Sequence, residues 1–232
     1  MNAPIRREGG KAKLAAKIAA LLPAGVYHEP FLGGGSVFLR HRPERAYLSD
    51  TDERVVNLWL AAQNDLNGLL GRLQAHRQLS SREHFMRVKA NPAHAADWWY
   101  LWRTSYYSGG NSYCKKNSHW SYRPGYWRAL HYLLRNATIA CQDYTRTDPQ
   151  PGHVVYLDPP YLNAQAGNYP MFGEDETAEL FKVARDWRDN GVRVFISNCN
   201  EARRFAADWK VEVFTTTYSM HNRLTVTELL CY

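Results

Sequence analysis

Two consecutive prolines, Pro159 and Pro160, limit what the middle of this 232-residue chain can form. Neither can donate a backbone hydrogen bond, so a strand that reaches them must end there. The apolar, β-branched run 154–157 comes directly before them and predicts a buried strand. The tetrad Asp158-Pro159-Pro160-Tyr161 is therefore expected at the carboxyl end of a strand, where open α/β sheets bind their ligands.

The groups of this tetrad suit a flat ring that carries an amino group. Asp158 and a proline carbonyl can accept the two amino hydrogens, and Tyr161 can stack on the ring. The competing interpretation is a tight proline turn with a surface aspartate. Because short motifs recur by chance, the tetrad alone does not decide between the two, and a second motif is needed.

The composition favours a nucleic-acid partner. The formal net charge is +7, and 13% of the residues are aromatic, many of them among basic residues. A basic excess favours a polyanionic partner, although solubility alone also explains it. The interleaved aromatic residues favour nucleic acid over a membrane surface. A chain of this length can hold one core, or a domain with an insertion.

The four cysteines, Cys114, Cys141, Cys199 and Cys231, form no CxxC pair. Their spacing indicates neither a zinc site nor a redox motif, so no metal is expected. A reduced intracellular compartment fits such cysteines best. The sequence has no apolar run of membrane-spanning length and no signal-peptide core, so a cytoplasmic protein is expected.

A strand, a glycine loop and a helix follow one another near the N-terminus. The run 26–31 predicts the strand, Gly33-Gly34-Gly35-Ser36 the loop, and 37–39 the start of the helix. This order is typical of nucleotide-cofactor sites. The loop has neither the full GxGxxG pattern of dinucleotide-binding proteins nor the GK[ST] ending of a P-loop, so neither of those classes is favoured.

Charged residues flank this loop on both sides. Upstream, Gly9-Gly10 precede an amphipathic helix predicted over 11–22, where they and Lys11 can bind an anion or simply begin the helix. Downstream, the run 45–49 predicts a second strand that ends at Asp50. Asp50 is placed to bind ribose hydroxyls, or to cap the long helix predicted over 52–73.

The stretch 74–135 is rich in His, Arg, Lys, Trp and Tyr. Within it, 108–123 mixes turn formers with aromatic and basic residues, and we interpret it as a loop or β-hairpin on a mostly helical insertion. Basic side chains there can contact phosphates and base edges, whereas the alternative is a solvated loop. The candidate DNA contacts are Arg103, Lys115, Lys116 and Arg123.

Strands and helices alternate through the rest of the chain. Helices are predicted over 176–189 and 201–209, and strands over 137–141, 192–197, 211–216 and 224–230, the last two as a closing antiparallel pair. Asp143 and Tyr144 follow the first of these strands, and Asn198 follows the second. The alternation predicts an α/β fold with a mostly parallel sheet.

Taken in order, these motifs resemble the Dam-type adenine-specific DNA methyltransferases. The resemblance lies in Gly9-Gly10-Lys11, Glu29-Pro30-Phe31-Leu32-Gly33-Gly34-Gly35-Ser36, Asp158-Pro159-Pro160-Tyr161, Ser197-Asn198 and Thr227-Glu228-Leu229-Leu230. It implies a Rossmann-like, S-adenosylmethionine-dependent methyltransferase sheet in an α/β fold with a mostly helical insertion. Residues 1–73 and 136–232 are then the catalytic, cofactor-binding domain, and 74–135 the target-recognition insertion that binds DNA.

The resemblance also implies roles for the motif residues. Asp158, Pro159 and Tyr161 are the expected catalytic residues, which act on the N6 amino group of an adenine flipped out of double-stranded DNA. Hydrogen bonds from that amino group to Asp158 and the Pro159 carbonyl favour a pyramidal nitrogen with a localised lone pair. The expected S-adenosylmethionine contacts are Gly10, Lys11, Phe31, Gly33, Gly34, Gly35, Ser36, Asp50, Asp143, Tyr144 and Asp158.

Two features depart from the family pattern. Arg7-Glu8 stand where the family often has an aromatic residue before Gly-Gly-Lys, and the insertion is short, which suggests a partner or a relaxed target sequence. The sequence leaves the biological setting open, whether restriction–modification, phage protection or regulation. A monomer or weak dimer is expected, with no membrane association.

Several rival functions remain at this point. An RNA adenine methyltransferase shares both motifs, and methylation of a cytosine amino group is chemically possible. A catalytically silent DNA-binding module is disfavoured by the intact motifs. A nicotinamide oxidoreductase is disfavoured by the incomplete glycine pattern and by the Asp158-Pro159-Pro160-Tyr161 tetrad.

Overall fold

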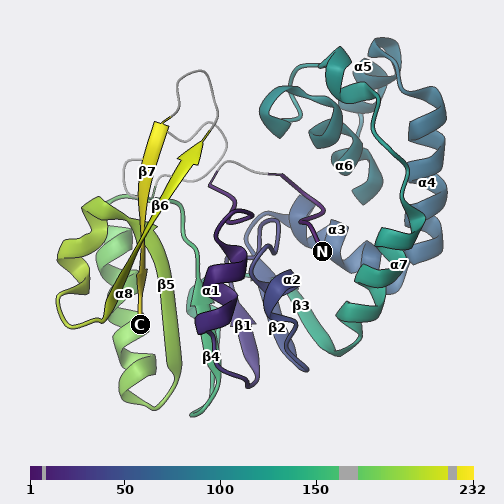
Figure 1. Cartoon of the computed structure of the whole chain (residues 1–232). Coiled ribbons are helices and arrows are strands. Elements are labelled where there is room, and N and C mark those ends of the chain that lie inside the picture. Colours follow the sequence, from purple (N-terminus) through teal and green to yellow (C-terminus); the bar gives the residue numbers. More distant parts are fainter. Residues whose placement is uncertain (7–8, 162–171, 219–223) are drawn as a thin grey trace.

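A seven-stranded sheet runs through the molecule in the order β3-β2-β1-β4-β5-β7-β6. The computed structural model in Figure 1 describes residues 1–6, 9–161, 172–218 and 224–232. The strands are β1 (Tyr27–Glu29), β2 (Ala46–Asp50), β3 (Ala137–Cys141), β4 (Val154–Leu157), β5 (Arg193–Cys199), β6 (Val211–Tyr218) and β7 (Leu224–Cys231).

The middle of the sheet contains a reversal of strand order. β1 pairs in parallel with both β2 and β4, and Tyr27 is opposite Ala46 on one side and Val154 on the other. The chain therefore builds outward from β1 to β3, returns to β4 and then builds in the other direction. β7 is antiparallel to both β5 and β6. The expected α/β fold, with a mostly parallel sheet and a closing antiparallel pair, is confirmed.

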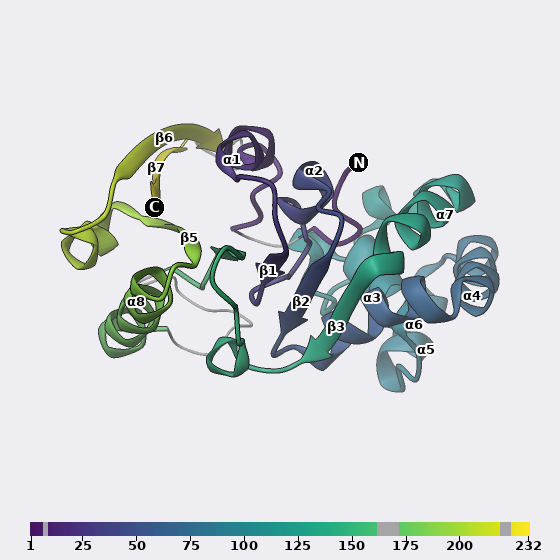
Figure 2. The same ribbon diagram turned by 90° about the horizontal axis from the view of Figure 1, so that it is seen from below.

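Helices cover both faces of the sheet. Figure 2 shows α1 (Ala15–Leu21) and α2 (Phe38–His41) on one face and α8 (Glu174–Asp189) on the other. The strands alternate between two cores accordingly: in β4, Val154 and Tyr156 belong to the core under α1 and α2, whereas Val155 and Leu157 belong to the core under α8. Burial on both faces explains why this strand is a continuous apolar run.

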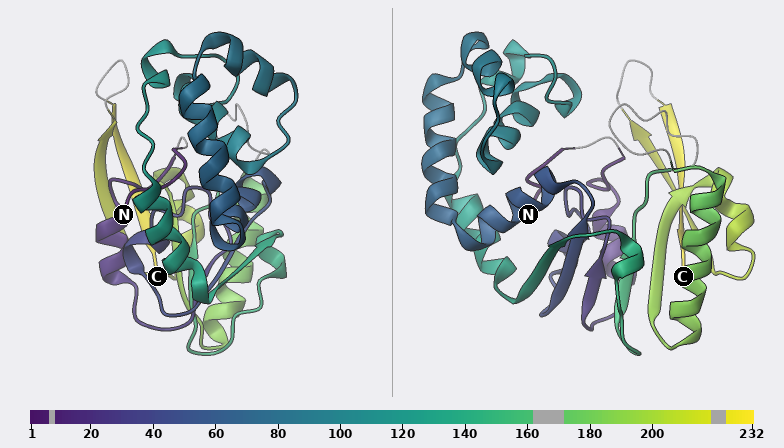
Figure 3. Two further views of the ribbon diagram at one scale, coloured as in Figure 1. Left: turned by 90° about the vertical axis from the view of Figure 1, so that its right-hand side faces the viewer. Right: turned by 180° about the vertical axis from the view of Figure 1, so that it is seen from behind.

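A helical unit, defined here as residues 66–133, lies beside β3 and away from β6 and β7 (Figure 3). Trp99 packs against Trp120 and Trp127, with ring centroids 4.8 and 5.9 Å apart, and all three belong to the core shared with the sheet. The unit comprises α4 (Leu66–Leu79), α5 (Arg82–Ala90), α6 (Ala95–Thr104), η1 (Tyr106–Ser108), η2 (Lys115–Ser118) and α7 (Pro124–Leu133).

The prediction of one long helix over 52–73 is wrong, because the structure has two helices in this range. α3 (Glu53–Asn64) ends at Asp65, and α4 begins directly after it. Asp65 separates them because its carboxylate accepts a hydrogen bond from the Gly68 N–H, which caps α4. α4 continues to Leu79, past the expected domain boundary at 73/74.

The expected β-hairpin within 108–123 is also absent from the described residues. An isolated antiparallel bridge joins Ser105 to Tyr113, and η2 follows as a short 3₁₀ helix. The chain there turns through Tyr107 and Ser108, whose φ angles are 50° and 57°, and no regular ladder forms. The segment is a loop, the other alternative that the sequence allowed.

Smaller differences occur at element ends. The helix predicted over 201–209 is a 3₁₀ helix, η5 (Asn200–Ala206), and two further 3₁₀ turns are η3 (Leu134–Asn136) and η4 (Tyr144–Arg146). The four cysteines are free thiols. Within the described ranges, no helix has the length and apolar character needed to cross a membrane.

Candidate active site

The two sequence motifs meet at the carboxyl edge of β1 and β4. Asp158 follows β4 directly, and the glycine loop follows β1, its parallel neighbour. Chain connections leave these two strands in opposite directions, so the edge between them is the switch point at which doubly wound sheets bind ligands.

Four side chains form a compact set beside Asp158, which we call the Lys11 cluster: Lys11, Asp158, Tyr161 and Glu228. The Lys11 ammonium lies 2.7 Å from Asp158 Oδ1 and 3.7 Å from Glu228 Oε2. It also donates a hydrogen bond to the Gly9 carbonyl at 2.7 Å and lies 4.6 Å from the centre of the Tyr161 ring. The Tyr161 hydroxyl donates to Glu228 Oε2 at 2.9 Å. The cluster thus joins residues from three distant parts of the chain.

The Lys11 cluster is largely shielded from solvent. The side chains of Lys11 and Glu228 are 2% and 3% exposed, and that of Asp158 is 19% exposed. Burial raises the pKa of Asp158, the Lys11 ammonium opposes that rise, and Glu228 adds to it. Burial, followed by the charge of Asp158, raises the pKa of Tyr161, which therefore stays a neutral hydrogen-bond donor.

The glycine loop is held from the end of β2. Asp50 Oδ2 accepts a hydrogen bond from the Gly33 N–H at 2.7 Å, and the Trp59 indole donates to the Gly33 carbonyl at 3.1 Å. Gly35 has a φ of 61°, and a Cβ there would lie 2.6 Å from the Trp59 ring, so this position requires glycine. The cap of α3 is Asp52, whose carboxylate accepts from the Arg54 N–H. The alternative role of Asp50 as that cap is therefore wrong.

Sequence reasoning gave no separate role to Glu29, which ends β1. Its carboxylate is buried and accepts hydrogen bonds from the Tyr27 hydroxyl at 2.8 Å and the Phe38 N–H at 3.1 Å. Burial raises its pKa to about 8, although these two hydrogen bonds oppose the shift. The sequence signal that could have pointed to Glu29 was an acidic residue at the end of a predicted strand.

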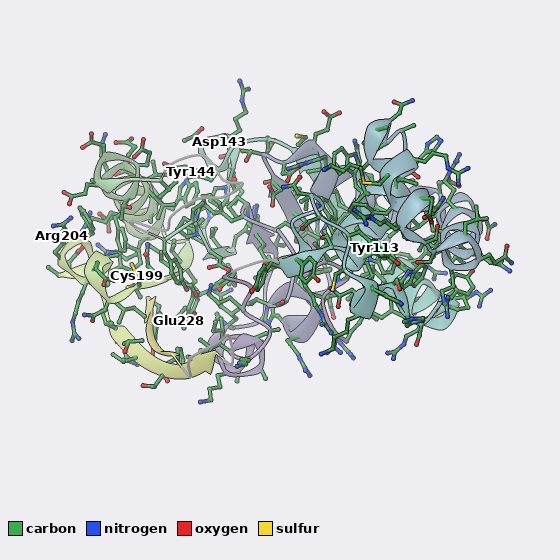
Figure 4. All side chains as sticks on the ribbon, turned by 90° about the horizontal axis from the view of Figure 1, so that it is seen from above. Tyr113, Asp143, Tyr144, Cys199, Arg204 and Glu228 are labelled. Carbon is green, nitrogen blue, oxygen red and sulfur yellow. The ribbon has the colours of Figure 1, made fainter. Side chains whose placement is uncertain are left out.

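An aromatic pair lies on the other side of the glycine loop. Phe31 and Tyr144 stack with ring centroids 5.4 Å apart, and Phe172 meets Phe31 edge-on at 6.2 Å. Burial raises the pKa of Tyr144 to about 12. Asp143 is exposed, and its carboxylate accepts from the Thr145 N–H and hydroxyl. Figure 4 shows Asp143 and Tyr144 toward the α8 side, with Glu228 toward β6.

The other expected cofactor contacts lie along the same edge of the sheet. Gly10 is exposed beside Lys11, and Gly34 and Ser36 are half-buried in the loop. Pro159, an expected catalytic residue, is buried directly after Asp158. No group of three or more His, Cys, Asp or Glu side chains in the described part of the chain is arranged to hold a metal ion.

The expected DNA contacts lie on the helical unit. Lys115 and Lys116 are exposed on η2, Arg123 precedes α7, and Arg103 is half-buried on α6. Burial lowers the pKa of Arg103, and the charges of Arg6 and Arg123 lower it further, so three guanidinium groups lie near one another. Residues 74–135 contain ten basic residues (Lys and Arg) and two acidic residues (Asp and Glu). The rest of the chain contains 19 basic and 20 acidic residues.

Two residues that the sequence analysis did not single out, Tyr106 and Tyr107, stand out on this unit. These residues are 56% and 59% exposed, and the backbone of Tyr107 is left-handed, with a φ of 50°. Such a conformation in a bulky residue is uncommon and concentrates at functional sites. The sequence signal was a pair of aromatic residues before Ser-Gly-Gly in a basic stretch.

Comparison with known proteins identifies one family. A family model described as D12 class N6 adenine-specific DNA methyltransferase matches residues 8–229. A type II methyltransferase from Lactococcus lactis subsp. cremoris is 24% identical over 226 residues, covering 82% of this chain and 78% of that protein. The DNA adenine methylase of Salmonella typhi is 28% identical over 229 residues, covering 84% of this chain and 79% of that protein.

The solved structures found by comparison are less similar to this chain in sequence. A putative methyltransferase from Escherichia coli, yhhF, has a TM-score of 0.41 and 13% identity, covering 100% of this chain and 90% of that one. The 23S rRNA methyltransferase ErmE has a TM-score of 0.41 and 11% identity, covering 98% of this chain and 68% of that one.

Lys11→Met should destabilise the protein, and the loss should grow with pH. The substitution leaves Asp158 buried without its ammonium partner, so its raised pKa rises further. A carboxyl whose folded pKa lies above its unfolded value near ~4 binds more protons when folded, so its contribution to stability falls as pH rises. We expect a loss of roughly 3–5 kcal/mol in urea unfolding at about pH 8, and a smaller loss at about pH 5.

The matched control is Lys182→Met on α8. The Lys182 side chain is 67% exposed and pairs with Glu179, so its loss should change the unfolding free energy by less than about 1 kcal/mol at either pH. A loss in Lys11→Met that does not vary with pH would contradict the assignment of its effect to the buried carboxylate.

Proposed function

Because the chain belongs to the D12 class N6 adenine-specific DNA methyltransferases, we propose that it transfers a methyl group from S-adenosylmethionine to N6 of an adenine flipped out of double-stranded DNA. That it is a DNA adenine methyltransferase follows from the family; the cofactor, the target atom and the flipped base are the proposal. One observation is the main support for this chemistry. The Asp158 carboxylate lies at the end of β4, where it pairs with Lys11, and the neighbouring strand β1 leads into the glycine loop.

The glycine loop and the aromatic pair fit S-adenosylmethionine. A Cβ at Gly33 would meet nothing within 4 Å, so the loop backbone faces open space that a ligand can fill. Asp50, at the end of the next strand, is placed for the ribose hydroxyls. Phe31 and Tyr144 provide an aromatic surface for the adenine ring of the cofactor. Bound there, the cofactor supplies an electrophilic methyl group on a sulfonium.

Asp158 and Tyr161 fit the amino group and ring of the substrate adenine. Lys11 contacts Asp158 Oδ1, so we assign the N6 amino group to Oδ2 and to the Pro159 carbonyl. These two acceptors favour a pyramidal nitrogen, whose lone pair forms the new bond to carbon as the bond from carbon to sulfur breaks. The methylated nitrogen is cationic at that point and releases a proton to Asp158 or to water.

The helical unit fits the DNA backbone. Its excess of basic residues, with the neighbouring Arg6, Arg103 and Arg123, suits phosphate groups. The exposed Tyr106 and Tyr107 suit bases, because every base offers a face on which an aromatic ring can stack. A paired adenine cannot reach the end of β4 from within a duplex, so binding must extrude it.

Asp50→Ala should weaken S-adenosylmethionine binding. It removes the proposed ribose acceptor and also the carboxylate that holds the Gly33 N–H. Losing a hydrogen bond to a charged group costs about 1.5–3 kcal/mol, which is at least about a tenfold rise in Kd. Isothermal titration calorimetry measures it, with the exposed Asp148→Ala as control. An unchanged Kd would remove Asp50 from the site.

Asp158→Ala should lower methyl transfer by orders of magnitude while the glycine loop still binds S-adenosylmethionine. The variant loses the acceptor that orients the amino group but leaves the loop contacts intact. The assay is tritiated methyl transfer to unmodified DNA, followed by nucleoside analysis, with RNA as a competing substrate. The expected product of the unaltered enzyme is N6-methyladenine in DNA. Label in cytosine or in RNA, or full activity in the variant, would overturn the assignment.

Replacing Lys115, Lys116 and Arg123 by Ala should weaken DNA binding and reduce its salt dependence. Each lost phosphate contact lowers the slope of log K against log salt by about 0.9, so the triple variant should lose about 3. Fluorescence anisotropy over a range of salt concentrations measures the slope. Lys182→Ala, exposed on α8, is the control. If affinity and slope both stay unchanged, the helical unit does not contact DNA through these residues.

A further inference from the structure

One buried acidic side chain at the active edge, Glu228, has no part in the chemistry proposed above. It lies on β7, opposite Cys199 of β5 and Phe214 of β6, and the residue is 2% exposed. Its carboxylate accepts a hydrogen bond from the Tyr161 hydroxyl at 2.9 Å and lies 3.7 Å from the Lys11 ammonium.

The alternation of β7 explains why this carboxylate reaches Lys11. Leu230 and Phe214 belong to the core under α1, whereas Leu229 belongs to the core under α8. Glu228, two residues before Leu230 on the same strand, therefore faces the α1 side, where Lys11 lies four residues before the helix begins at Ala15. The antiparallel return of β7 beside β5 places this position next to the end of β4.

We propose that Glu228 is a positioning residue of this enzyme, which holds the Tyr161 hydroxyl and the Lys11 ammonium so that both flank Asp158 and leave Oδ2 for the substrate amino group. The inference rests on the proposed function, since it assigns a role within the same site. Glu228 is not assigned contact with substrate or cofactor; it acts through its two neighbours.

The charge of Glu228 is the reason to give it a role beyond packing. A glutamine amide oxygen could also accept a hydrogen bond from the Tyr161 hydroxyl, and it would not repel the nearby Asp158. Burying the carboxylate of Glu228 beside that of Asp158 stabilises the fold less than burying a neutral residue of similar volume would. The charge of Glu228 gives the Lys11 ammonium a second partner. Lys11 therefore lies between two carboxylates, instead of contacting both oxygens of Asp158.

Glu228→Gln keeps the acceptor for Tyr161 and removes the charge that shares Lys11. We expect kcat for methyl transfer to fall about tenfold, with the KM for DNA and the Kd for S-adenosylmethionine changed by less than about threefold. The matched control is Glu212→Gln on β6, whose carboxylate accepts from the Tyr232 hydroxyl away from the site. That variant should keep the kinetics of the unaltered enzyme.

The pH profile separates positioning from a general structural effect. Titratable groups that interact with Asp158 are Lys11, Glu228, Tyr161, Tyr156, Tyr27 and Glu29. Glu228 raises the pKa of Asp158, so Glu228→Gln should move the acidic limb of kcat/KM to lower pH. A purely structural loss would reduce activity without moving this limb.

A double-mutant cycle tests the contact through Tyr161. Glu228→Ala and Tyr161→Phe each remove the hydrogen bond between the two residues, so the effect of Glu228→Ala on kcat should be clearly smaller in the Tyr161→Phe background. If Glu228→Ala does not fold, as judged by circular dichroism, the kcat and pH profile of Glu228→Gln, which retains the side-chain volume, carry the test.

The proposal is overturned if Glu228→Gln has the kcat and pH profile of the unaltered enzyme, or if Glu228→Ala and Tyr161→Phe are fully additive. Failure of the proposed function looks different, because the unaltered enzyme would then not form N6-methyladenine in DNA at all. A folded Glu228→Gln with reduced kcat, a shifted acidic limb and unchanged cofactor binding supports the proposal.

Discussion

The parallel pairing of β1 with β4 brings together the two halves of this active edge. β1 is three residues long and aligns with β4 through the pairs Tyr27–Val154 and His28–Val155. Because side chains alternate along a strand, a slip of one residue would exchange the two faces of β4 between the cores above and below the sheet. The apolar contacts of both cores therefore fix the position of Asp158 relative to the glycine loop.

Burying the Lys11 ammonium dominates the electrostatics of this edge. An ammonium with 2% exposure is costly unless carboxylates surround it, and Asp158 and Glu228 both do so. The same arrangement keeps Asp158 in an ion pair even though burial raises its pKa. The buried charge of Lys11 thus holds in place the carboxylate that we propose as a hydrogen-bond acceptor in the reaction. Burying these charges costs stability, which the two sheet cores must offset.

The parts of the structure that the sequence predicted are those with local signals. Apolar runs and the proline pair located the strands, and glycines located the loop after β1. The Lys11 cluster could not be derived this way, because Glu228 reaches Lys11 only through the antiparallel return of β7. The break at Asp65 was missed because tertiary packing and a side-chain cap outweighed a continuous helical pattern. The role of Asp50 was undecided because Glu53, three residues on, fits a capping box with Asp50, whereas the structure caps α3 with Asp52.

The distribution of charge along the chain fits the two parts of the proposed reaction, which are binding of the DNA backbone and methylation of a base. The stretch 74–135 carries the basic excess, whereas the remaining residues are close to neutral. The carboxylates of Asp158 and Glu228 at the sheet edge would repel a phosphate, but they do not repel an uncharged base. In the proposed reaction, DNA held through its backbone on the helical unit would therefore offer an extruded base to this edge. The sign of the charge at each place thus favours a flipped nucleobase over the intact duplex as the species that reaches Asp158.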